Sequence, residues 1–327
     1  MLRTTEVKTI AVLLPCLNEE AMIADVVRNF RRSLPSATVF VYDNNSSDRT
    51  AQVARAAGAQ VRTELLQGKG NVVRRMFADV EADVYVVADG DGTYDASVAP
   101  AMVEKLVAEK LDMVVATRLE SRGDQLFRPF HRFGNLTITR LVGLLFGRRF
   151  TDILSGYRVF TKRFVKSFPG LATGFEIETE FTIHALLLKM PVAEIPSRYG
   201  ARSGSESKLN TLKDGFRILR MIVYFFKEIR PLAFFSTIGG FLTLLSIVLA
   251  YPVFITFLAT GFVPRFPTAI LSTGIMLLAS MSFVCGLILN SLAGARWEAK
   301  RALYLANPVD GAPAAGEPPT AGGDGGP

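Results

Sequence analysis

The segment VVADGDGTYD, residues 86–95, joins a short apolar run to three acidic residues, Asp89, Asp91 and Asp95. Asp and Gly are common turn residues, so an exposed turn is the simplest interpretation of this segment. In a sheet of parallel strands, however, ligands bind beyond the carboxyl ends of the strands. The interpretation therefore depends on the fold around the segment.

The first two thirds of the chain alternates strand-like and helix-like segments. Apolar runs predict strands at residues 9–15, 37–43, 59–65, 83–89 and 111–118. Helical patterns lie between them, and Asn18 stands near the expected start of the first; the patterns cover residues 18–34, 46–58, 71–82 and a helix opened by Pro100. This alternation predicts an α/β fold with a mostly parallel, Rossmann-like sheet flanked by helices.

Polar clusters follow four of the predicted strands. They are PCLNEE (15–20), DNNSSD (43–48), DGDGTYD (89–95) and TR (117–118). Because the carboxyl ends of parallel strands meet at one edge of a sheet, we expect the four clusters to form one site. An exposed turn explains one cluster but not all four.

Asp89 and Asp91 are the expected metal ligands. One residue separates them, so a turn can direct both carboxylates at one hard cation, and Gly90 and Gly92 let the backbone bend close to a ligand. We expect Mg²⁺ or Mn²⁺, shared with the diphosphate of a substrate.

Basic residues supply the expected phosphate contacts. Lys69 lies between Gly68 and Gly70 before a predicted helix, where backbone N–H groups can approach a phosphate. Residues 118–149 contain seven arginines against two acidic residues, and the guanidinium group suits phosphate. The basic residues behind the net charge of +7 concentrate toward the half of the chain next to the two long uncharged segments described below. As binding partners, this placement favours anionic lipid headgroups or phosphorylated small molecules over nucleic acid.

Glu176, Glu178 and Glu180 admit two interpretations. In the first turn of a helix they stabilise its positive end, which we expect of at least two of them. One that faces the site is instead a candidate general base. The two cysteines, Cys16 and Cys285, have no paired spacing and predict neither a disulfide nor a zinc site.

Two long uncharged segments lie in the last third of the chain. Residues 231–264 and 266–295 contain no charged side chain, and each exceeds the roughly 20 apolar residues that span a bilayer. We expect membrane helices at about 232–257 and 268–292. Lysines and arginines flank the pair and only Arg265 lies between, so the positive-inside rule predicts a hairpin with both flanks in the cytoplasm.

Eight segments resemble, in order, motifs of the membrane-anchored family 2 glycosyltransferases that load sugars onto polyprenyl phosphate, including dolichol-phosphate mannose synthases and undecaprenyl-phosphate glucosyltransferases. They are PCLNE (15–19), DNNSSDRT (43–50), GKGNVVR (68–74), DGDG (89–92), FGN (133–135), TDILSGYRVF (151–160), GFEIETE (174–180) and SGSESKLNT (203–211). The resemblance covers about residues 8–230. It implies a GT-A fold and inverting, metal-dependent transfer of a hexose from a UDP- or GDP-sugar to undecaprenyl or dolichyl phosphate.

The resemblance also implies roles for individual residues. Asp89 and Asp91 would bind the metal and, with Arg118 and Arg132, act in catalysis. The residues implied to bind the nucleotide sugar are Pro15, Leu17, Asn18, Glu19, Asp43, Asn45, Lys69, Asp89, Gly90, Asp91, Arg202, Ser205 and Lys208, and those implied to bind the lipid phosphate are Arg118, Arg132 and Asn135. Two positions depart from the family pattern: Leu17 replaces a frequent tyrosine, and Thr93 stands where mannose synthases tend to have glutamine.

These expectations divide the chain into four parts. Residues 1–202 form a cytosolic GT-A domain, 203–230 an amphipathic segment in the membrane interface, 231–295 a two-helix transmembrane hairpin, and 296–327 a cytosolic, mostly disordered tail. The expected protein is a two-span protein of a bacterial or archaeal plasma membrane with both termini cytoplasmic. Homo-oligomerisation through the hairpin is left open.

Three other functions are weighed against this one. Processive polysaccharide synthases usually carry a Gln-x-x-Arg-Trp motif and more spans, whereas the only tryptophan here is Trp297. A non-enzymatic nucleotide-binding tether would not need both Asp89 and Asp91. A nucleotidyltransferase would need neither a membrane anchor nor an arginine cluster for an acceptor.

Overall fold

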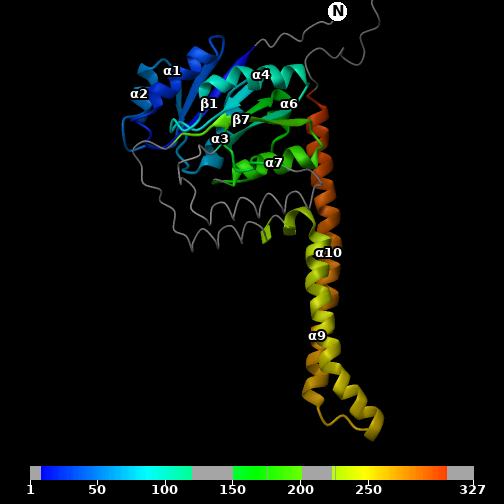
Figure 1. The fold of residues 1–327 in the computed structure, drawn as a ribbon. Coiled ribbons are helices and arrows are strands. Elements are labelled where there is room, and N and C mark those ends of the chain that lie inside the picture. Colours follow the sequence, from blue (N-terminus) through cyan, green and yellow to red (C-terminus); the bar gives the residue numbers. More distant parts are fainter. Residues whose placement is uncertain (1–8, 120–149, 175, 201–222, 225, 308–327) are drawn as a thin grey trace, which may run out of the picture. The chain divides into compact units, whose positions relative to one another are not determined.

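The computed structural model describes residues 9–119, 150–174, 176–200, 223–224 and 226–307 (Figure 1). The described chain divides into two compact units: a sheet-containing unit of residues 9–119, 150–200 and 300–307, and a helical unit of residues 223–299. Several predictions fall outside the described residues. They are the roles of Arg132, Asn135, Arg202, Ser205 and Lys208, most of the amphipathic segment at 203–230, and the tail beyond residue 307.

The first unit is built on a seven-stranded sheet. Its strands are β1 (Ile10–Cys16), β2 (Thr38–Asp43), β3 (Gln60–Thr63), β4 (Val84–Val87), β5 (Met113–Leu119), β6 (Arg158–Thr161) and β7 (Val192–Arg198). Their order in the sheet is β3-β2-β1-β4-β6-β5-β7, and β6 alone runs antiparallel to its neighbours. The mostly parallel sheet is confirmed; the antiparallel β6 was not predicted from the sequence.

Helices cover both faces of this sheet (Figure 1). The helices on one face are α1 (Ile23–Ser33), α2 (Thr50–Ala56) and α4 (Ala99–Ala108), which follows the short η1 (Ala96–Val98); those on the other are α3 (Lys69–Asp79), α6 (Lys162–Ser167) and α7 (Ile177–Leu187). The expectation that the first helix starts near Asn18 is wrong. Asn18 has a φ of 56°, in the left-handed region, so the chain turns there before α1 begins at Ile23.

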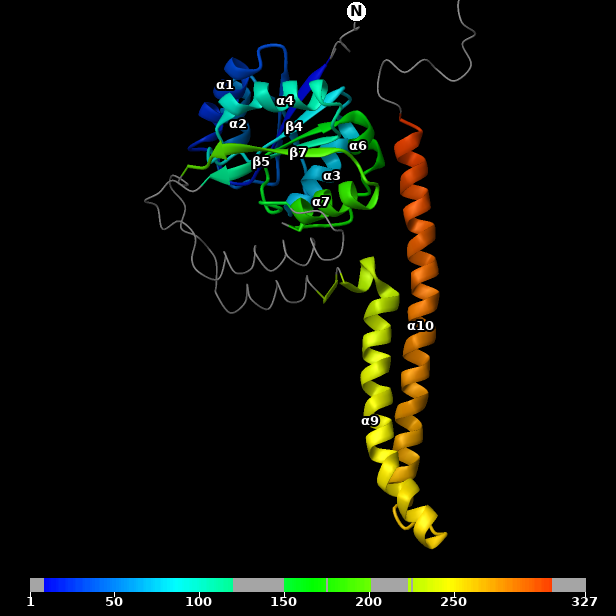
Figure 2. The same ribbon diagram turned by 45° about the vertical axis from the view of Figure 1, so that its right-hand side comes forward.

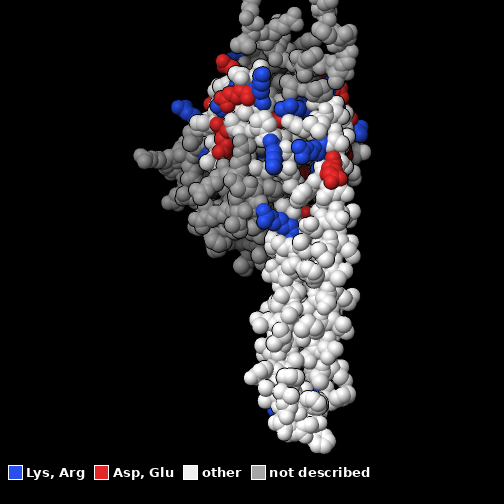
Figure 3. Space-filling model, turned by 90° about the vertical axis from the view of Figure 1, so that its right-hand side faces the viewer, with Lys and Arg blue, Asp and Glu red and all other residues white. Residues whose placement is uncertain are grey.

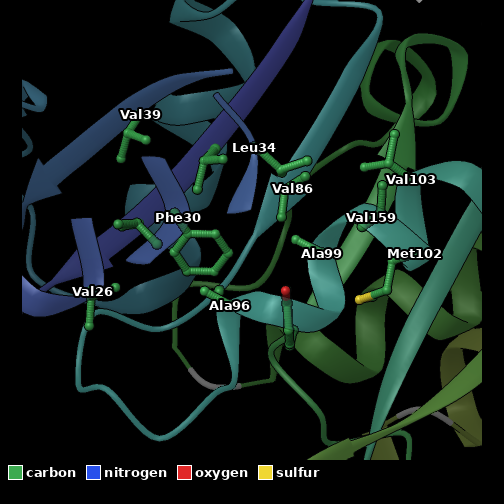
Figure 4. Close-up of a cluster of buried hydrophobic side chains, with 14 of the residues drawn as sticks. Val26, Phe30, Leu34, Val39, Val86, Ala96, Ala99, Met102, Val103 and Val159 are labelled. Atoms are coloured by element: carbon green, nitrogen blue, oxygen red, sulfur yellow. The ribbon is translucent and has the colours of Figure 1, made fainter. Parts of the chain in front are cut away.

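The core has two different layers because alternate strand residues point to opposite faces of the sheet. On the α1 and α4 face, aliphatic side chains dominate; Figure 4 shows members of this cluster, among them Val26 and Phe30 of α1, Leu34 just after it, and Val39, Val86 and Met102. The other face is aromatic, where Phe77 of α3, Phe164 of α6 and Phe181 of α7 contact Phe160 of β6. Both layers exclude water from the strands, so the sheet is a rigid base for the loops at its edge.

His184 of α7 is buried in the aromatic layer. Its ring contacts Phe164 and Phe168, and its Nε2 lies 3.0 Å from the Ser167 hydroxyl. Burial, with a smaller effect from the charge of Lys300, lowers the pKa of His184 to about 3. The imidazole is therefore neutral in the folded protein at neutral pH.

This burial predicts a loss of stability in acid. The unfolded chain binds a proton on His184 below a pKa of about 6.5 and the folded chain does not, so stability falls as the pH decreases from about 6.5 toward 3. Between pH 7 and pH 4.5 we expect the parent to lose about 2–3 kcal/mol more unfolding free energy than a His184→Gln variant. Denaturant unfolding followed by circular dichroism at both pH values measures this difference. Equal losses in the two proteins would contradict it.

The second unit contains the long helix α9 (Pro231–Thr260) and α10 (Phe266–Leu305) up to Ala299. Both helices are long and apolar enough to cross a membrane, and only 11% of the most apolar stretch of each is buried. They lie side by side in Figures 1 and 2, and Figure 3 shows a surface without charged side chains over most of their length. The segments expected at 232–257 and 268–292 lie within these two helices.

Small residues line the contact between α9 and α10. Ser246 donates a hydrogen bond to the Ser272 carbonyl at 2.8 Å, and Ser282 donates one to the Phe235 carbonyl at 2.9 Å. The buried residues of α10 recur every seven positions, which keeps them on one face of the helix; they are Ser272, Ala279, Gly286 and Ala293. Small side chains allow close approach of the backbones, and the hydroxyls are satisfied across the helix pair.

Candidate active site

The four polar clusters lie at one edge of the sheet, as predicted. Strands β1, β2 and β4 are parallel neighbours, and β5 runs in the same direction because both β4 and β5 are antiparallel to β6. Their carboxyl ends therefore open onto the same edge, which we call the site edge. It comprises residues 15–20, 43–48, 89–95 and 117–118.

Hydrogen bonds join the loops after β1 and β2. The Asn18 side chain accepts a hydrogen bond from the Ser47 amide at 2.8 Å, and the Ser46 hydroxyl accepts one from the Asn18 amide at 2.9 Å. The Glu19 amide donates to the Thr50 hydroxyl at 2.8 Å. Asn18 and Glu19 therefore belong to one rigid, two-loop segment, next to Pro15 at the end of β1.

Asp43 is buried at the end of β2 between these loops. Its Oδ2 accepts a long hydrogen bond of 3.4 Å from the Ser46 amide, whereas its Oδ1 has no hydrogen-bond partner among the described residues. A buried carboxylate oxygen without a partner is costly unless a ligand satisfies it. Leu17 and Asn45 are exposed beside it.

Asn44, which was not singled out in the sequence, connects three segments of the site edge. Its amide donates to the Cys16 carbonyl at 2.8 Å, and its Nδ2 donates to the carbonyls of Glu64 and Leu66 at 3.0 and 2.8 Å. Its Oδ1 accepts from the Gly68 amide at 2.7 Å. No local pattern reveals this role, because Asn44 sits in a run of polar residues.

The Asp89–Asp91 turn is fixed by close packing at Gly90 and by hydrogen bonds from Thr93 to Asp91. A Cβ at Gly90 would lie 2.3 Å from the Cys16 sulfur, so glycine is required there for close packing against β1. Asp91 Oδ1 accepts hydrogen bonds from the Thr93 amide at 3.1 Å and the Thr93 hydroxyl at 2.7 Å. Thr93 thus orients the Asp91 carboxylate.

The donor set at this turn fits a magnesium or manganese ion shared with a substrate. No group of three or more His, Cys, Asp or Glu residues that could hold a metal occurs in the described part of the chain. Mg²⁺ commonly uses one or two carboxylates and completes its shell with water and substrate phosphates. Two carboxylates on an open sheet edge meet that requirement.

Lys69 lies between two carboxylates. Its Nζ is 2.5 Å from Asp89 Oδ1 and 2.5 Å from Glu178 Oε1. Burial alone lowers the pKa of the Lys69 ammonium, but the charges of Asp89 and Glu178 outweigh it and raise that pKa above its usual range. Burial also raises the pKa of Glu178, against the effect of Lys69.

The two glycines beside Lys69 serve a purpose different from the expected phosphate cradle. The Gly68 amide donates to Asn44 Oδ1, and the Gly70 amide donates to the Thr173 carbonyl at 3.1 Å. A Cβ at Gly70 would lie 2.1 Å from the Ala172 carbonyl oxygen. These N–H groups are therefore occupied within the protein, and the glycines permit a backbone-to-backbone contact that positions Lys69.

The loop before β6 covers the Lys69–Asp89 pair. A Cβ at Gly156 would lie 2.9 Å from Lys69 Nζ and 3.1 Å from Asp89 Oδ2, so the backbone passes close to both. The Gly156 amide donates to the Tyr94 hydroxyl at 2.8 Å, and the Tyr94 ring contacts Tyr157. Burial and the charge of Asp89 raise the pKa of Tyr94, which keeps it neutral.

Arg158 supports this loop from inside the protein. The buried guanidinium donates to the carbonyls of Ile153 and Ser155 at 2.7 and 2.9 Å and to the Thr182 hydroxyl at 2.9 Å. Burial lowers its pKa to about 10. The TDILSGYR motif thus folds around its own arginine, which fixes the position of Gly156.

Arg118 is paired with a carboxylate of the same loop. Its Nε and Nη2 donate to the two Asp152 oxygens at 2.7 and 2.8 Å, with the two side chains 16% and 8% exposed. The guanidinium also lies over the Tyr199 ring, 5.5 Å from its centroid. Asp152 was not predicted, because its partner lies 34 residues away.

The three glutamates of α7 differ in role. Glu178 contacts Lys69, and Glu180 accepts hydrogen bonds from the amides of Leu171 and Ala172 at 3.0 and 2.8 Å. Glu176 is the residue before the helix and makes no side-chain capping bond. The structure places Glu178 and Glu180 in the first turn of α7, as expected of at least two of the three, and both also contact other segments.

Comparison with known proteins places this site in a family. Residues 11–167 match the model of glycosyl transferase family 2. The glycosyltransferase AglJ of Haloferax volcanii is 34% identical over 232 residues, 70% of this chain and 76% of AglJ. The dolichyl-phosphate hexose transferase of the same organism is 28% identical over 215 residues, 65% of this chain and 92% of that protein.

A solved structure shares the fold. The glucosyl-3-phosphoglycerate synthase of Mycobacterium tuberculosis, crystallised with Mn²⁺, uridine diphosphate and phosphoglyceric acid, has a TM-score of 0.53 and 24% identity, and the match covers 66% of this chain and 76% of that one. The fold is therefore of the GT-A type. From these matches, and from a site edge that carries the DGDG segment, the chain belongs to glycosyl transferase family 2.

Proposed function

We propose that this protein transfers a hexose from a UDP- or GDP-sugar to the phosphate of a membrane polyprenyl phosphate of the undecaprenyl or dolichyl type. One observation carries the choice of acceptor: a family 2 domain is followed by two apolar helices long enough to cross a bilayer. A polyprenyl phosphate resides in a bilayer, so a membrane-anchored transferase meets its acceptor there. The similarity to the dolichyl-phosphate hexose transferase of Haloferax volcanii supports this choice.

In this proposal the donor nucleotide binds between the loops after β1 and β2. Asp43 Oδ1, which is buried with no hydrogen-bond partner in the described part of the chain, accepts a hydrogen bond from the base, and Leu17 and Asn45 are exposed beside it. Pro15, Asn18 and Glu19 complete the rigid loop segment around the nucleotide. The donor diphosphate then extends toward Lys69, Gly90 and the two acids.

Asp89 and Asp91 would hold Mg²⁺ or Mn²⁺, with the donor diphosphate completing the cation's shell. When bound, the cation neutralises the diphosphate and the leaving nucleoside diphosphate. Arg118, with Arg132 and Asn135, receives the acceptor phosphate, and Arg202, Ser205 and Lys208 contact the donor phosphates. The last five residues lie outside the described part of the chain.

The reaction needs alignment of two anions more than it needs a base. A phosphate monoester has a second pKa of about 6 and is largely dianionic near neutral pH, so it is already a nucleophile. Its oxygen forms a bond to the anomeric carbon as the bond from that carbon to the diphosphate oxygen breaks. A single displacement of this kind inverts the anomeric configuration, and cationic side chains lower its cost by holding the two anions together.

The positive-inside rule extends the proposal to topology. Lys227 and Arg230 precede α9, and Arg296, Lys300 and Arg301 follow the uncharged part of α10. We therefore propose that the sheet-containing unit and both termini lie on the cytoplasmic face of a bacterial or archaeal plasma membrane.

The test is transfer of radiolabel from a panel of UDP- and GDP-hexoses to undecaprenyl and dolichyl phosphate by the full chain in bilayers, with Mg²⁺ or Mn²⁺ and with chelator. We expect organic-extractable label from one donor, only with metal, and an inverted anomeric configuration by NMR. Label on a water-soluble acceptor such as 3-phosphoglycerate, with none on either lipid, would contradict the proposed acceptor.

A further inference from the structure

Lys69 contacts the Asp89 carboxylate directly, so a cation bound at Asp89 would repel its ammonium group. The Lys69 and Glu178 side chains are 10% and 6% exposed, whereas Asp89 is 28% exposed. Asp89 therefore faces the site edge, and Lys69 and Glu178 lie behind it. The three charged groups form a chain from the turn after β4 through α3 to α7.

A divalent cation on Asp89 competes with the Lys69 ammonium for the same carboxylate. At 2.5 Å the ammonium is in direct contact with Asp89 Oδ1, and two cations on one carboxylate repel each other strongly where water is excluded. The ammonium can yield only if another anion holds its charge, since an unpaired buried charge is costly.

Glu178 is in position to pair with the displaced ammonium. Its Oε1 already contacts Lys69, and its Oε2 is buried with no hydrogen-bond partner among the described residues. Glu178 therefore has a carboxylate oxygen that the described residues leave without a hydrogen bond. Gly156 leaves room for the movement, because any side chain there would meet Lys69 Nζ.

We propose that Lys69 neutralises Asp89 before the cation binds and shifts to Glu178 when it binds, so that Glu178 sets the affinity of the site for the cation. Glu178 is thus a positioning residue that acts on the cation through Lys69. This inference rests on the metal role proposed above for Asp89 and Asp91. This role of Glu178 differs from both roles considered in the sequence analysis, helix capping and general base catalysis.

The test is direct binding of Mn²⁺ alone to the full chain in nanodiscs, measured from the electron paramagnetic resonance signal of the free ion. In Glu178→Gln the ammonium of Lys69 keeps only the Asp89 carboxylate of its two carboxylate partners and cannot shift away from it. We therefore expect the Kd for Mn²⁺ to rise about 10-fold or more. Lys69→Met/Glu178→Gln removes the competing ammonium and its partner together. We expect this double variant to bind Mn²⁺ at least as tightly as the parent.

Glu104→Gln, on the exposed surface of α4, is the control for loss of one negative charge and should leave the Kd unchanged. Circular dichroism identifies any variant that fails to fold, and the uncharged double variant then carries the test. A Kd in Glu178→Gln within about twofold of the parent, a double variant that binds as weakly as Glu178→Gln, or a parent that binds no Mn²⁺ would overturn the inference. A parent that binds Mn²⁺ but labels no polyprenyl phosphate would overturn the proposed acceptor and not this inference.

Discussion

Asp91→Asn is expected to lower the rate of sugar transfer by about 10²–10³-fold, comparable with the effect of removing one polar group that stabilises a transition state, such as an oxyanion-hole donor. The substitution keeps the side-chain shape, and an asparagine oxygen can still accept the hydrogen bonds from the Thr93 amide and hydroxyl. The turn should therefore keep its fold while one of the two proposed metal-binding carboxylates loses its charge. The same change at Asp89 is less clean, because it also removes a partner of Lys69.

The measurement is the transfer rate at saturating donor over a range of Mg²⁺ or Mn²⁺ concentrations. We expect a lower maximal rate and a higher metal concentration at half-maximal rate. Asp25→Asn, on the exposed surface of α1, makes the identical chemical change away from the site and should retain parental rates. An Asp91→Asn protein with near-parental rate and unchanged metal dependence would show that this carboxylate does not hold the metal.

Arg118→Met is expected to destabilise the sheet-containing unit by about 3–5 kcal/mol, because it leaves the Asp152 carboxylate buried without its cation. Both side chains are largely buried, at 16% and 8% exposure, and the pair is bidentate. Replacing both partners by uncharged groups of similar shape avoids that penalty. Arg118→Met/Asp152→Asn should therefore recover most of the lost stability.

The same double variant separates a structural role of Arg118 from a role in binding phosphate. If the guanidinium receives the acceptor phosphate, the stable double variant still transfers sugar slowly and needs more polyprenyl phosphate to reach half-maximal rate. Denaturant unfolding and transfer kinetics on the parent, the single variant and the double variant provide both readouts. Parental kinetics in a stable double variant would assign Arg118 to the support of the loop at 151–157 and not to the acceptor.

The pairing of Arg118 with Asp152 has a consequence for how the site is assembled. Asp152 and Gly156 come from the short loop before β6, and Arg158 is the first residue of that strand; together they reach Arg118 on β5, Lys69 on α3 and Thr182 on α7. A shift of this loop would move groups on the proposed acceptor and donor sides together. Holding reacting groups within a few tenths of an ångström requires such support from packed, buried residues.

The sequence by itself determined five of the seven strands, β1 to β5, the edge that carries the site, the Asp89–Asp91 pair and the two apolar helices. Each of these follows from a local property: apolar periodicity, polar residues directly after strands, or more than about 20 uncharged residues in a row. The structure confirmed the mostly parallel sheet and the common edge, and showed two helices long enough to span a membrane. The start of α1 was misjudged because Asn18 is held in the left-handed region by the neighbouring loop.

Only the tertiary structure decided which partners the charged residues have. Lys69 meets Glu178, Arg118 meets Asp152, and Asn44 meets Gly68, in each case across a loop or helix that separates them in the chain. The backbone contact at Gly70 and the antiparallel direction of β6 are likewise set by packing of distant segments. Local pattern cannot encode such contacts, because their stability comes from burial and charge pairing that exist only after the chain has closed its loops.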